Sequence, residues 1–501
     1  MEPGLTRYEV VVVGAGAAGG WAAKELSERG LRVAVLDAGP LMATPDGTGL
    51  ERRPVQSENY ACTEATSHFF VDDIENPYQV APGTDYHWIR GRQVGGRLHV
   101  WGRTSPRMED DEFKAASRDG IGDDWPISAS DLEPAYQRVE NFLAVRRVPL
   151  VAAERALKAA IERRWPTRAV QETPWAGREP MRPLQAALRT GHVTLFADTI
   201  AERVLAGSGG ERATGVGVVD RYTGDRYEIE ARAVVLCASA LESTRLLLNS
   251  ATRDHPNGLA NSSGVLGRYL MDHTYGIAYR GVTPRRPEEA YEPPSQGGFL
   301  AGFRNVTEPL EEFRRGYAIE FQVTTRPHRS RRLRRGVRDD FWMSAFGEVL
   351  PDFDNRVELD REHVDAWGIP TLRVSARYGD NERAMARDQA AAMREMLEAG
   401  GFEITSSQTE LAPPGSSAHE MGTARMGSDP ATSVLNAHNQ AWDVPNLFVT
   451  DAASFTSSGH RNPTLTIMAL TVRACGYLAE RLETPASRPR RESGAAQKSI
   501  G

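Results

Sequence analysis

Side chains that could carry acid–base chemistry gather near the C-terminal end of this sequence. His419 lies in the loop-like stretch SSAHEMGTARMGSDP, whereas His460 and Asn462 directly precede a long apolar run. The ordinary pKa of histidine lies near neutrality, so an imidazole can accept a proton at physiological pH. Between these two groups, Asp451 ends an apolar strand pattern. An acid in that place stands at the end of a strand where ligands often bind.

The segment that begins at Asn462 has the pattern of a helix start. Asparagine is a favourable N-cap, and Pro463 suits the first helical position. Residues 464–481 are apolar almost all round, which predicts a buried helix. The N-terminal end of such a helix presents free N–H groups and the positive end of its dipole, which favour negative charge. Two interpretations stay open from the residues alone: Asn462 only caps the helix, or the helix start belongs to a site.

A nucleotide-binding pattern stands at the N-terminal end of the chain. An apolar strand at 10–13 is followed at once by Gly14, Gly16 and Gly19. The first glycine permits a tight turn, the second lets a pyrophosphate approach the backbone, and the third lets the following helix pack against the strand. A second strand ends in Asp37, whose carboxylate can accept hydrogen bonds from ribose hydroxyls. The pattern predicts a dinucleotide site; Asp37 argues against NADP and leaves NAD and FAD open.

Further segments fit the same nucleotide-binding unit. Residues 91–108 combine closely spaced glycines with aromatic and imidazole rings, so their backbone can approach a flat ligand. Residues 233–237 predict an apolar strand, and Ala238 follows it where a parallel strand faces a ligand crevice. An amphipathic helix with Ser130 as its cap is expected between these segments.

The pattern changes after about residue 275. Strand-like stretches at 316–324 and 341–349 alternate with connections rich in Pro and Arg, and a helical run follows at 382–398. This region predicts a second domain built on a sheet. A chain of 501 residues is longer than one compact core usually accommodates, which favours two domains or one large discontinuous domain.

Composition argues against several classes of function. A net charge of −7 gives no reason to expect nucleic acid or a membrane as a partner, and the basic run at 329–335 is interpreted as a solvated loop. Cys62, Cys237 and Cys475 form neither a disulfide framework nor a metal-ligand spacing, and the histidines are not clustered, so no metal is expected. With no signal-like or membrane-spanning apolar run, the sequence predicts a soluble, cytoplasmic protein.

The ordered segments together resemble the glucose–methanol–choline (GMC) family of FAD-dependent oxidoreductases. The combination of motifs is specific, although each motif alone is not, and it follows the family order along nearly the whole chain. The motifs are Gly14-x-Gly16-x-x-Gly19 with Asp37; Gly91-Arg92-x-Val94-Gly95-Gly96; Asn261-Ser262-Ser263-Gly264 with Leu270-Met271-Asp272-His273; Asn355-Arg356-Val357 with Trp367-Gly368-Ile369-Pro370; His419-x-x-Gly422-Thr423-x-x-Met426-Gly427; Asn446-Leu447-Phe448-Val449-x-Asp451; and Asn462-Pro463-Thr464-Leu465-Thr466.

The resemblance implies an α/β fold with two domains. One is a Rossmann-like FAD-binding domain of the type that the family shares with p-hydroxybenzoate hydroxylase, and the other is an antiparallel-sheet substrate domain. The expected division is 1–274 for the first part of the FAD-binding domain, with substrate-domain excursions around 41–80 and 144–190, 275–430 for the substrate domain, 431–482 for the C-terminal part of the FAD-binding domain, and 483–501 for a disordered tail.

The resemblance also implies roles for the polar residues. The family oxidises an alcohol carbon: a histidine takes the hydroxyl proton while hydride passes to flavin N5. His419 holds the position of that base, Asn462 holds the position of the second catalytic polar residue, and His460 is a rival base. An alcohol is too weak an acid to lose its proton unaided, so a base such as histidine suits the task. The residues expected to bind FAD are Gly14, Gly16, Ala17, Ala18, Gly19, Asp37, Ala38, Arg92, Val94, Gly95, Gly96, His99, Val100, Trp101, Gly102, Ile200, Ala238, Asp451, Asn462, Pro463 and Thr464.

Within the family, the Asn-Pro-Thr-Leu-Thr ending is similar to the branch of pyranose oxidases, sugar-3-oxidising enzymes and gluconate dehydrogenase flavin subunits. Two departures from these relatives affect the expectations. Val100 stands where covalent pyranose oxidases have a flavin-linked histidine before Trp101, and His99 is displaced by one residue, so FAD is expected to bind noncovalently. Ser239 stands where relatives commonly have glycine.

The sequence therefore predicts a FAD-dependent oxidase or dehydrogenase that converts a secondary ring hydroxyl of a sugar or glycoside to a ketone. Carbon 3 of an O- or C-glycoside is one candidate position, and oxygen or another soluble electron acceptor would reoxidise the flavin. Three alternatives stay open: an oxidoreductase of a choline-like, sterol or long-chain alcohol, a non-redox flavin lyase, and a colourless NAD-dependent dehydrogenase. The oligomeric state also stays open.

Overall fold

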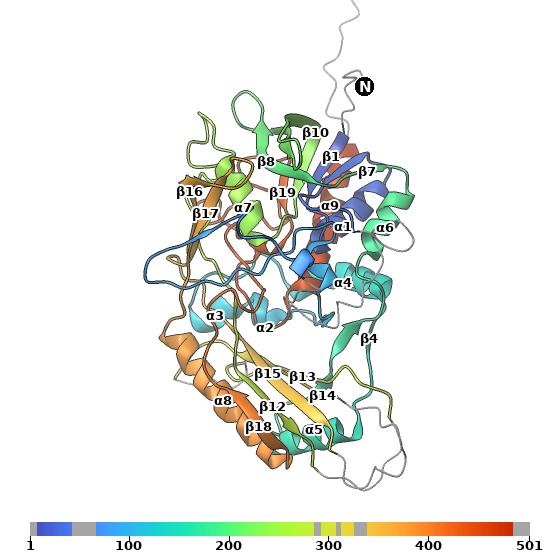
Figure 1. Ribbon diagram of the computed structural model, residues 1–501, viewed down its shortest axis with the longest axis vertical. Helices are drawn as coiled ribbons and strands as arrows, with labels where there is room; N and C mark the ends of the chain where they lie inside the picture. The colour runs from blue at the N-terminus through green and yellow to red at the C-terminus, as the bar shows by residue number, and fades with distance from the viewer. Residues whose placement is uncertain (1–7, 43–66, 285–291, 307–311, 325–337, 484–501) are drawn as a thin grey trace, which may run out of the picture.

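The computed structural model describes residues 8–42, 67–284, 292–306, 312–324 and 338–483. Several features named above lie outside these residues: Cys62, the basic run at 329–335, the 43–66 part of the 41–80 excursion, and the 484–501 part of the expected tail. Figure 1 shows two lobes arranged along the long axis, each built around one large sheet.

The first lobe contains a seven-stranded sheet in the order β7-β2-β1-β10-β9-β8, with β19 paired to β10. Its strands are β1 (Tyr8–Val13), β2 (Val33–Leu36), β7 (Val193–Phe196), β8 (Thr199–Ala206), β9 (Ala213–Asp220), β10 (Arg226–Leu236) and β19 (Leu447–Val449). Strands β2, β1 and β10 run parallel, and residues 10–13 of β1 are fully buried, as their unbroken apolar run predicts. The sheet confirms the predicted Rossmann-like unit.

The helices of this lobe pack on the sheet or on one another. They are α1 (Ala17–Ser27), α4 (Ala129–Leu143), α6 (Arg182–Arg189), α7 (Ala240–Asn249) and α9 (Thr464–Glu483). Helix α1 lies against α6 and α9, and α9 also contacts α4. The expected cap of α4 at Ser130 is wrong, because the helix already starts after Ser128. The backbone N–H of Ser128 donates to Oδ2 of Asp131 at 2.8 Å, and the reciprocal bonding of a capping box fixes that earlier start.

The second lobe contains the predicted antiparallel sheet, in the order β18-β12-β15-β14-β13-β5 with β11 paired to β15. Its strands are β5 (Gln171–Glu172), β11 (His273–Thr274), β12 (Ala278–Val282), β13 (Gly298–Phe303), β14 (Tyr317–Thr324), β15 (Asp340–Glu348) and β18 (Glu403–Gln408). Helices α5 (Ala152–Arg164) and α8 (Asp380–Ala399) pack on it and on each other (Figure 1). Phe341, Met343 and Ala345 alternate into the core, as expected for a sheet with one buried face.

The two cores interleave along the chain. A small sheet of β16 (Arg356–Val364), β17 (Pro370–Ser375) and β3 (Gln79–Val80) belongs with the first lobe, since Val357, Leu372 and Val374 lie in the first core. The remaining short elements are β4 (Val145–Arg147), β6 (Pro174–Ala176), α2 (Asp110–Phe113), α3 (Ala115–Asp119) and the single turns η2 (Ser67–Phe69), η3 (Gly96–His99) and η5 (Ala452–Ser454). Among the described helices, none has the length and apolarity that crossing a membrane requires.

Two adjacent glycines of α1 give a sharp test of this packing. A Cβ on Gly19 would lie 1.7 Å from the carbonyl oxygen of Gly14, whereas a Cβ on Gly20 would meet only ordinary contacts at 3.5 Å or more. We expect Gly19→Ala to lower the thermal unfolding midpoint sharply. Gly20→Ala should be tolerated or stabilising by up to about 1 kcal/mol, because alanine is the better helix former. Equal midpoints for the two variants would contradict the close approach of α1 to β1.

Candidate active site

A cavity of about 340 Å³ lies at the C-terminal ends of the parallel strands of the first sheet, where open α/β sheets bind ligands. Its wall combines the β1–α1 turn, residues 88–104, the connection from β10 to α7, the loop at 417–420 and the start of α9. Tyr275, Glu320 and Phe346 reach it from the second lobe. Its size is within the range of small-molecule and cofactor sites.

The nucleotide end of the cavity is shaped by the N-terminal glycines. Gly14 has a φ of 95°, and a Cβ there would lie 2.4 Å from the carbonyl oxygen of Cys237. A Cβ on Gly16 would meet only the carbonyl oxygen of Gly95, at 3.8 Å, so the start of α1 is open to a ligand. The packing of Cys237 against Gly14 leaves no room for a side chain at Gly14, whereas the space beside Gly16 is free for a pyrophosphate.

Asp37 sits at the end of β2, buried beside these glycines. Its two carboxylate oxygens accept hydrogen bonds from the backbone N–H groups of Ala15 and Gly39, each at 3.0 Å. Burial raises the pKa of Asp37 to about 6 in spite of these two hydrogen bonds. The carboxylate is thus held in a fixed orientation on the cavity wall, where it can accept further hydrogen bonds from hydroxyl groups.

His419 lies on the cavity wall, where its side chain is half-buried. Its Nδ1 is 2.9 Å from Nδ1 of His273, and its ring centroid is 5.9 Å from that of Phe346. Burial lowers the pKa of His419 well below its ordinary value, and the neighbouring His273 and Arg97 act in the same direction. The imidazole is therefore neutral at pH 7 and has a lone pair available for a proton.

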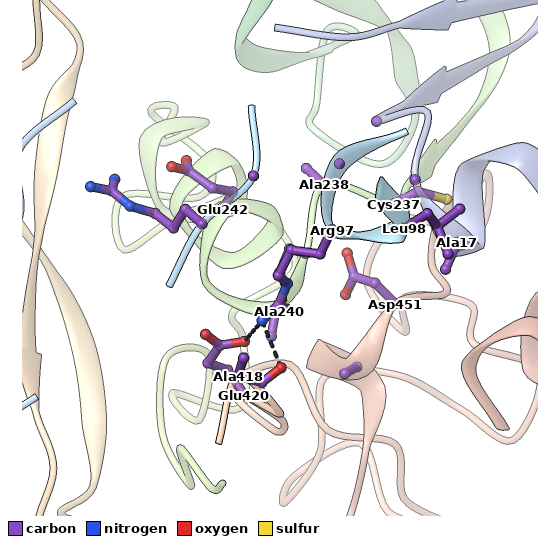
Figure 2. Close-up of a pocket in the computed structure, with 18 of the residues that line it drawn as sticks. Ala17, Arg97, Leu98, Cys237, Ala238, Ala240, Glu242, Ala418, Glu420 and Asp451 are labelled. Carbon is purple, nitrogen blue, oxygen red and sulfur yellow. Dashed lines mark hydrogen bonds and ion pairs between the residues drawn. The ribbon is translucent and has the colours of Figure 1, made fainter. Parts of the chain in front are cut away.

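Arg97 fastens the loop that carries His419. Figure 2 shows its side chain extending from the glycine-rich segment toward Ala418 and Glu420. Nη1 donates to the carbonyl oxygen of Ala418 at 2.6 Å and pairs with Glu420 at 2.8 Å, while Nη2 donates to Oγ of Ser239 at 3.3 Å. Ser239 itself has a φ of 80°, a conformation that costs a residue with a side chain about 1–3 kcal/mol. One guanidinium thus joins the end of β10 to both neighbours of His419.

Asn462 and Glu320 form a second polar group on the cavity wall. Asn462 lines the cavity, and its amide hydrogen-bonds the carboxyl group of Glu320. Burial raises the pKa of Glu320 to about 7, although this hydrogen bond lowers it. The expectation that Asn462 caps the helix is wrong: the first helical hydrogen bond runs from Ile467 N–H to the carbonyl oxygen of Pro463, at 2.9 Å. The amide of Asn462 is therefore directed at Glu320.

His460 lies outside the cavity. Its backbone N–H donates to Oε1 of Glu112 at 2.9 Å, and its Nδ1 is 3.6 Å from the same oxygen. Arg461 pairs with Glu112 as well, so His460 belongs to a buried ionic cluster behind the site. The turn at Gly459, with a φ of 62°, directs the chain this way. The structure thus separates His460 from the residues that face a ligand.

Most residues expected to bind FAD do line the cavity. They are Gly14, Gly16, Ala17, Ala18, Asp37, Ala38, Arg92, Gly96, Trp101, Gly102, Ile200, Ala238, Asp451, Asn462, Pro463 and Thr464. Five others do not: Gly19, Val94, Gly95, His99 and Val100. The imidazole of His99 is held 2.8 Å from the carbonyl oxygen of Val94 behind the wall, and Val100 packs in a separate apolar cluster. These positions argue against a covalent link between His99 and a flavin.

Several cavity residues were not predicted from the sequence. Arg97, Tyr275, Glu320 and Phe346 line the wall, and His273 stands directly behind His419. Glu320 could have been identified from the sequence, because an acid between apolar neighbours on a buried strand requires a partner or a function. For Arg97 and the two aromatic residues, no local pattern distinguishes them from ordinary loop and strand residues.

The residues present fit FAD. Asp37 suits a ribose, the open approach at Gly16 suits a pyrophosphate, and the buried Nη1 of Arg92 has no hydrogen-bond partner among the described residues, so it can donate to a ligand. A group that brings phosphate and hydroxyl oxygens would satisfy all three features.

Comparison with known proteins agrees with this assignment. Residues 9–44 match an FAD binding domain, and residues 181–275 and 351–471 match the two parts of the GMC oxidoreductase family. The chain is 29% identical to a 2-methyl-1,2-propanediol dehydrogenase from Mycolicibacterium austroafricanum, over 96% of this chain and 97% of the relative. It is 26% identical to a C-glycoside 3-oxidase from Microbacterium trichothecenolyticum, over 95% and 97% of the two chains.

A solved structure supports the fold. The crystal structure of pyridoxine 4-oxidase from Mesorbium loti superposes with a TM-score of 0.64 at 19% identity, over 95% of this chain and 99% of the other. The family matches span the glycine turn, the end of β10 and the loop and helix start that hold His419 and Asn462. The protein described here is an FAD-binding oxidoreductase of the GMC family.

Proposed function

We propose that this enzyme oxidises a secondary ring hydroxyl of a sugar or glycoside to a ketone, with carbon 3 of an O- or C-glycoside as one candidate position. Bound FAD supplies the hydride acceptor, and oxygen or another soluble electron acceptor completes the turnover. The observation that carries the proposal is a neutral, half-buried imidazole at His419 on the same cavity as Asn462 and Glu320. A base, a hydrogen-bonding amide and an acid suit a substrate with more than one hydroxyl group.

His419 takes the proton of the reacting hydroxyl. Its lowered pKa keeps it unprotonated at neutral pH, and its loop is held by Arg97. Asn462 orients the hydroxyl, while its hydrogen bond to Glu320 fixes the rotation of the amide. The N–H groups in the first turn of α9, beside Pro463 and Thr464, add positive potential at the same wall. All these groups are in place before a substrate arrives, which reduces the reorganisation that the reaction needs.

The cavity also has an apolar side that suits a sugar ring. Tyr275 and Phe346 stack with centroids 5.8 Å apart and planes at 25°, and both line the cavity. Aromatic faces bury large apolar area, and Glu320 and Asn462 add polar groups to the wall of the same cavity. A pyranose ring has an apolar C–H face and a polar rim, so it can contact both kinds of group. The name of the C-glycoside 3-oxidase relative supports the same class of substrate.

One relative favours a second candidate function. The name of the 29% identical protein specifies an acyclic 1,2-diol, which also presents two neighbouring oxygens. The candidates separate in one anaerobic experiment that mixes the enzyme with sugars, glycosides, 2-methyl-1,2-propanediol and simple alcohols and follows loss of flavin absorbance. Preferential reduction by glycosides supports the first proposal. Preferential reduction by the acyclic diol overturns it, and readmission of air tests oxygen as the acceptor.

The base assignment predicts the behaviour of two histidine variants. We expect His419→Ala to slow flavin reduction by substrate about 10²- to 10⁴-fold, the usual contribution of a general base. His460→Gln should reduce its bound FAD at a rate close to that of the parent enzyme, because His460 does not line the cavity. Anaerobic single-turnover absorbance, normalised to bound FAD, measures both. The opposite pattern would identify His460 as the base.

Glu320 predicts a pH dependence of substrate binding. Because its pKa is about 7, the carboxylate form accumulates as the pH rises through 7, and a carboxylate accepts stronger hydrogen bonds from hydroxyl groups. KM should therefore fall as the pH rises through this range. Glu320→Gln should raise KM at high pH by roughly 10- to 100-fold, since a hydrogen bond to a charged group contributes about 1.5–3 kcal/mol.

Glutamine keeps the shape of the side chain and can still accept from Asn462, so this variant tests the charge alone. Its KM should no longer change near pH 7. If KM of the Gln variant still falls as the pH rises through 7, the titration belongs to another group. Asp272 is the alternative, because burial also raises its pKa to about 7 and its carboxylate accepts the backbone N–H of His419 at 3.2 Å.

A further inference from the structure

His273 occupies the space directly behind His419. It begins strand β11, its side chain is fully buried, and it does not line the cavity. One ring nitrogen, Nδ1, is 2.9 Å from Nδ1 of His419. The other, Nε2, faces the carbonyl oxygens of Gly459 at 3.1 Å and Ser458 at 3.4 Å. The imidazole thus links the backbone before α9 to the histidine on the cavity wall.

The partners of His273 determine which of its nitrogens carries the proton. A carbonyl oxygen only accepts hydrogen bonds, so Nε2 must be the protonated nitrogen. Burial lowers the pKa of His273 to about 4, and the ring therefore holds a single proton at pH 7. Nδ1 of His273 is left with a lone pair. Only a donor can face it at hydrogen-bond distance, and that donor is Nδ1–H of His419.

We propose that His273 is a positioning residue that holds His419 in the Nδ1–H tautomer, so that Nε2 of His419 is the atom that accepts the proton. The proposal rests on the proposed function, in which His419 is the base. A neutral imidazole has one donor and one acceptor nitrogen, and the hydrogen bond at one nitrogen decides the state of the other. The opposite tautomer of His419 would place two lone pairs against each other at 2.9 Å.

Further contacts hold both the turn at Ser458 and the two imidazole rings in place. Oγ of Ser458 accepts from the backbone N–H of Val349 at 3.1 Å and donates to the carbonyl oxygen of the same residue at 3.2 Å. These two hydrogen bonds fix the turn whose carbonyl groups His273 recognises. The rings of His273 and His419 meet edge to face, with centroids 5.0 Å apart and planes at 85°. The ring of Phe346 lies beside both, with its centroid 6.5 Å from that of His273 and 5.9 Å from that of His419.

Nitrogen NMR of the holoenzyme labelled with ¹⁵N-histidine tests the tautomer directly. Long-range ¹H–¹⁵N correlations distinguish a protonated ring nitrogen from one with a lone pair, and the His419 signals are identified by their loss in His419→Ala. We expect Nδ1 of His419 to be protonated and Nε2 to carry the lone pair. A protonated Nε2 and an unprotonated Nδ1 in the parent enzyme would overturn the proposal, whatever the activity of the variants.

Two substitutions at His273 test the consequence for the reaction. His273→Phe keeps a ring but offers no acceptor, whereas the Oδ1 of His273→Asn can occupy the position of the former Nδ1. We expect the Phe variant to slow flavin reduction about 10- to 100-fold, the loss typical of removing the partner behind a working imidazole. KM should change little, and His273→Asn should recover most of the rate. Equal losses in both variants would contradict the role of the acceptor.

Tyr378→Phe is the matched control for a purely structural effect. The Tyr378 hydroxyl donates to the backbone carbonyl oxygen of His273 at 3.2 Å, so its removal perturbs the same segment without touching the imidazole. The control should keep both the rate and the His419 tautomer. A loss of rate as large as that of His273→Phe would show that the segment matters only for packing. If His419→Ala instead reduces flavin normally while the NMR result holds, the proposed function fails and the tautomer assignment stands.

Discussion

The fixed position of two backbone carbonyl groups, those of Ser458 and Gly459, is the constraint on which the site depends. Their oxygens can only accept, so they set the proton of His273, which in turn faces the imidazole of His419. The turn lies where the lobes meet. Nε1–H of Trp125 donates to Oγ of Ser457 at 2.8 Å. Oγ of Ser458 accepts a hydrogen bond from the backbone N–H of Val349, the residue that follows β15. The protonation of the candidate base is thus coupled to the contact between the two lobes.

A buried ionic cluster supports that turn. Glu112 lies beneath it and contacts Arg461 and the backbone N–H of His460. Burial would raise the pKa of Glu112, but Arg461 and His460 outweigh burial, and the pKa is lowered. Taking these charges out of water costs free energy, and removing one partner of such a pair typically costs about 3–5 kcal/mol. Within the cluster, Glu112 holds the backbone N–H of His460 and the guanidinium of Arg461, the two residues that directly follow the turn at Gly459.

The parts of the fold that could be predicted from sequence are those encoded locally. The β1–α1 glycines and Asp37 lie within one stretch of chain, and their spacing alone indicates a strand, a turn, a helix and a second strand. Family resemblance added the order of the distant motifs and the position of His419. Asn462 and Glu320 come from different lobes, so their hydrogen bond could not be read from either segment.

His460 and His273 show the same limit of prediction from sequence. The sequence makes His460 a rival base because it precedes Asn462, yet the turn at Gly459, where φ is 62°, directs it toward Glu112. His273 belongs to a motif of the family resemblance that assigns it no role, and the pairing of β11 with β15 brings it behind His419. Residue type and spacing identify groups that can carry chemistry. Backbone conformation at single residues decides which of them meet.

Burial, more than neighbouring charge, sets the protonation states around the cavity. It is the largest cause of the raised pKa of Asp37, Glu320 and Asp451, and of the lowered pKa of His419. Each shift favours the neutral form, as expected for a region from which water is largely excluded. An imidazolium at 419 would be disfavoured by the same burial and by Arg97. A proton gained there during oxidation is therefore readily released again, which suits a base that must be restored after every turnover.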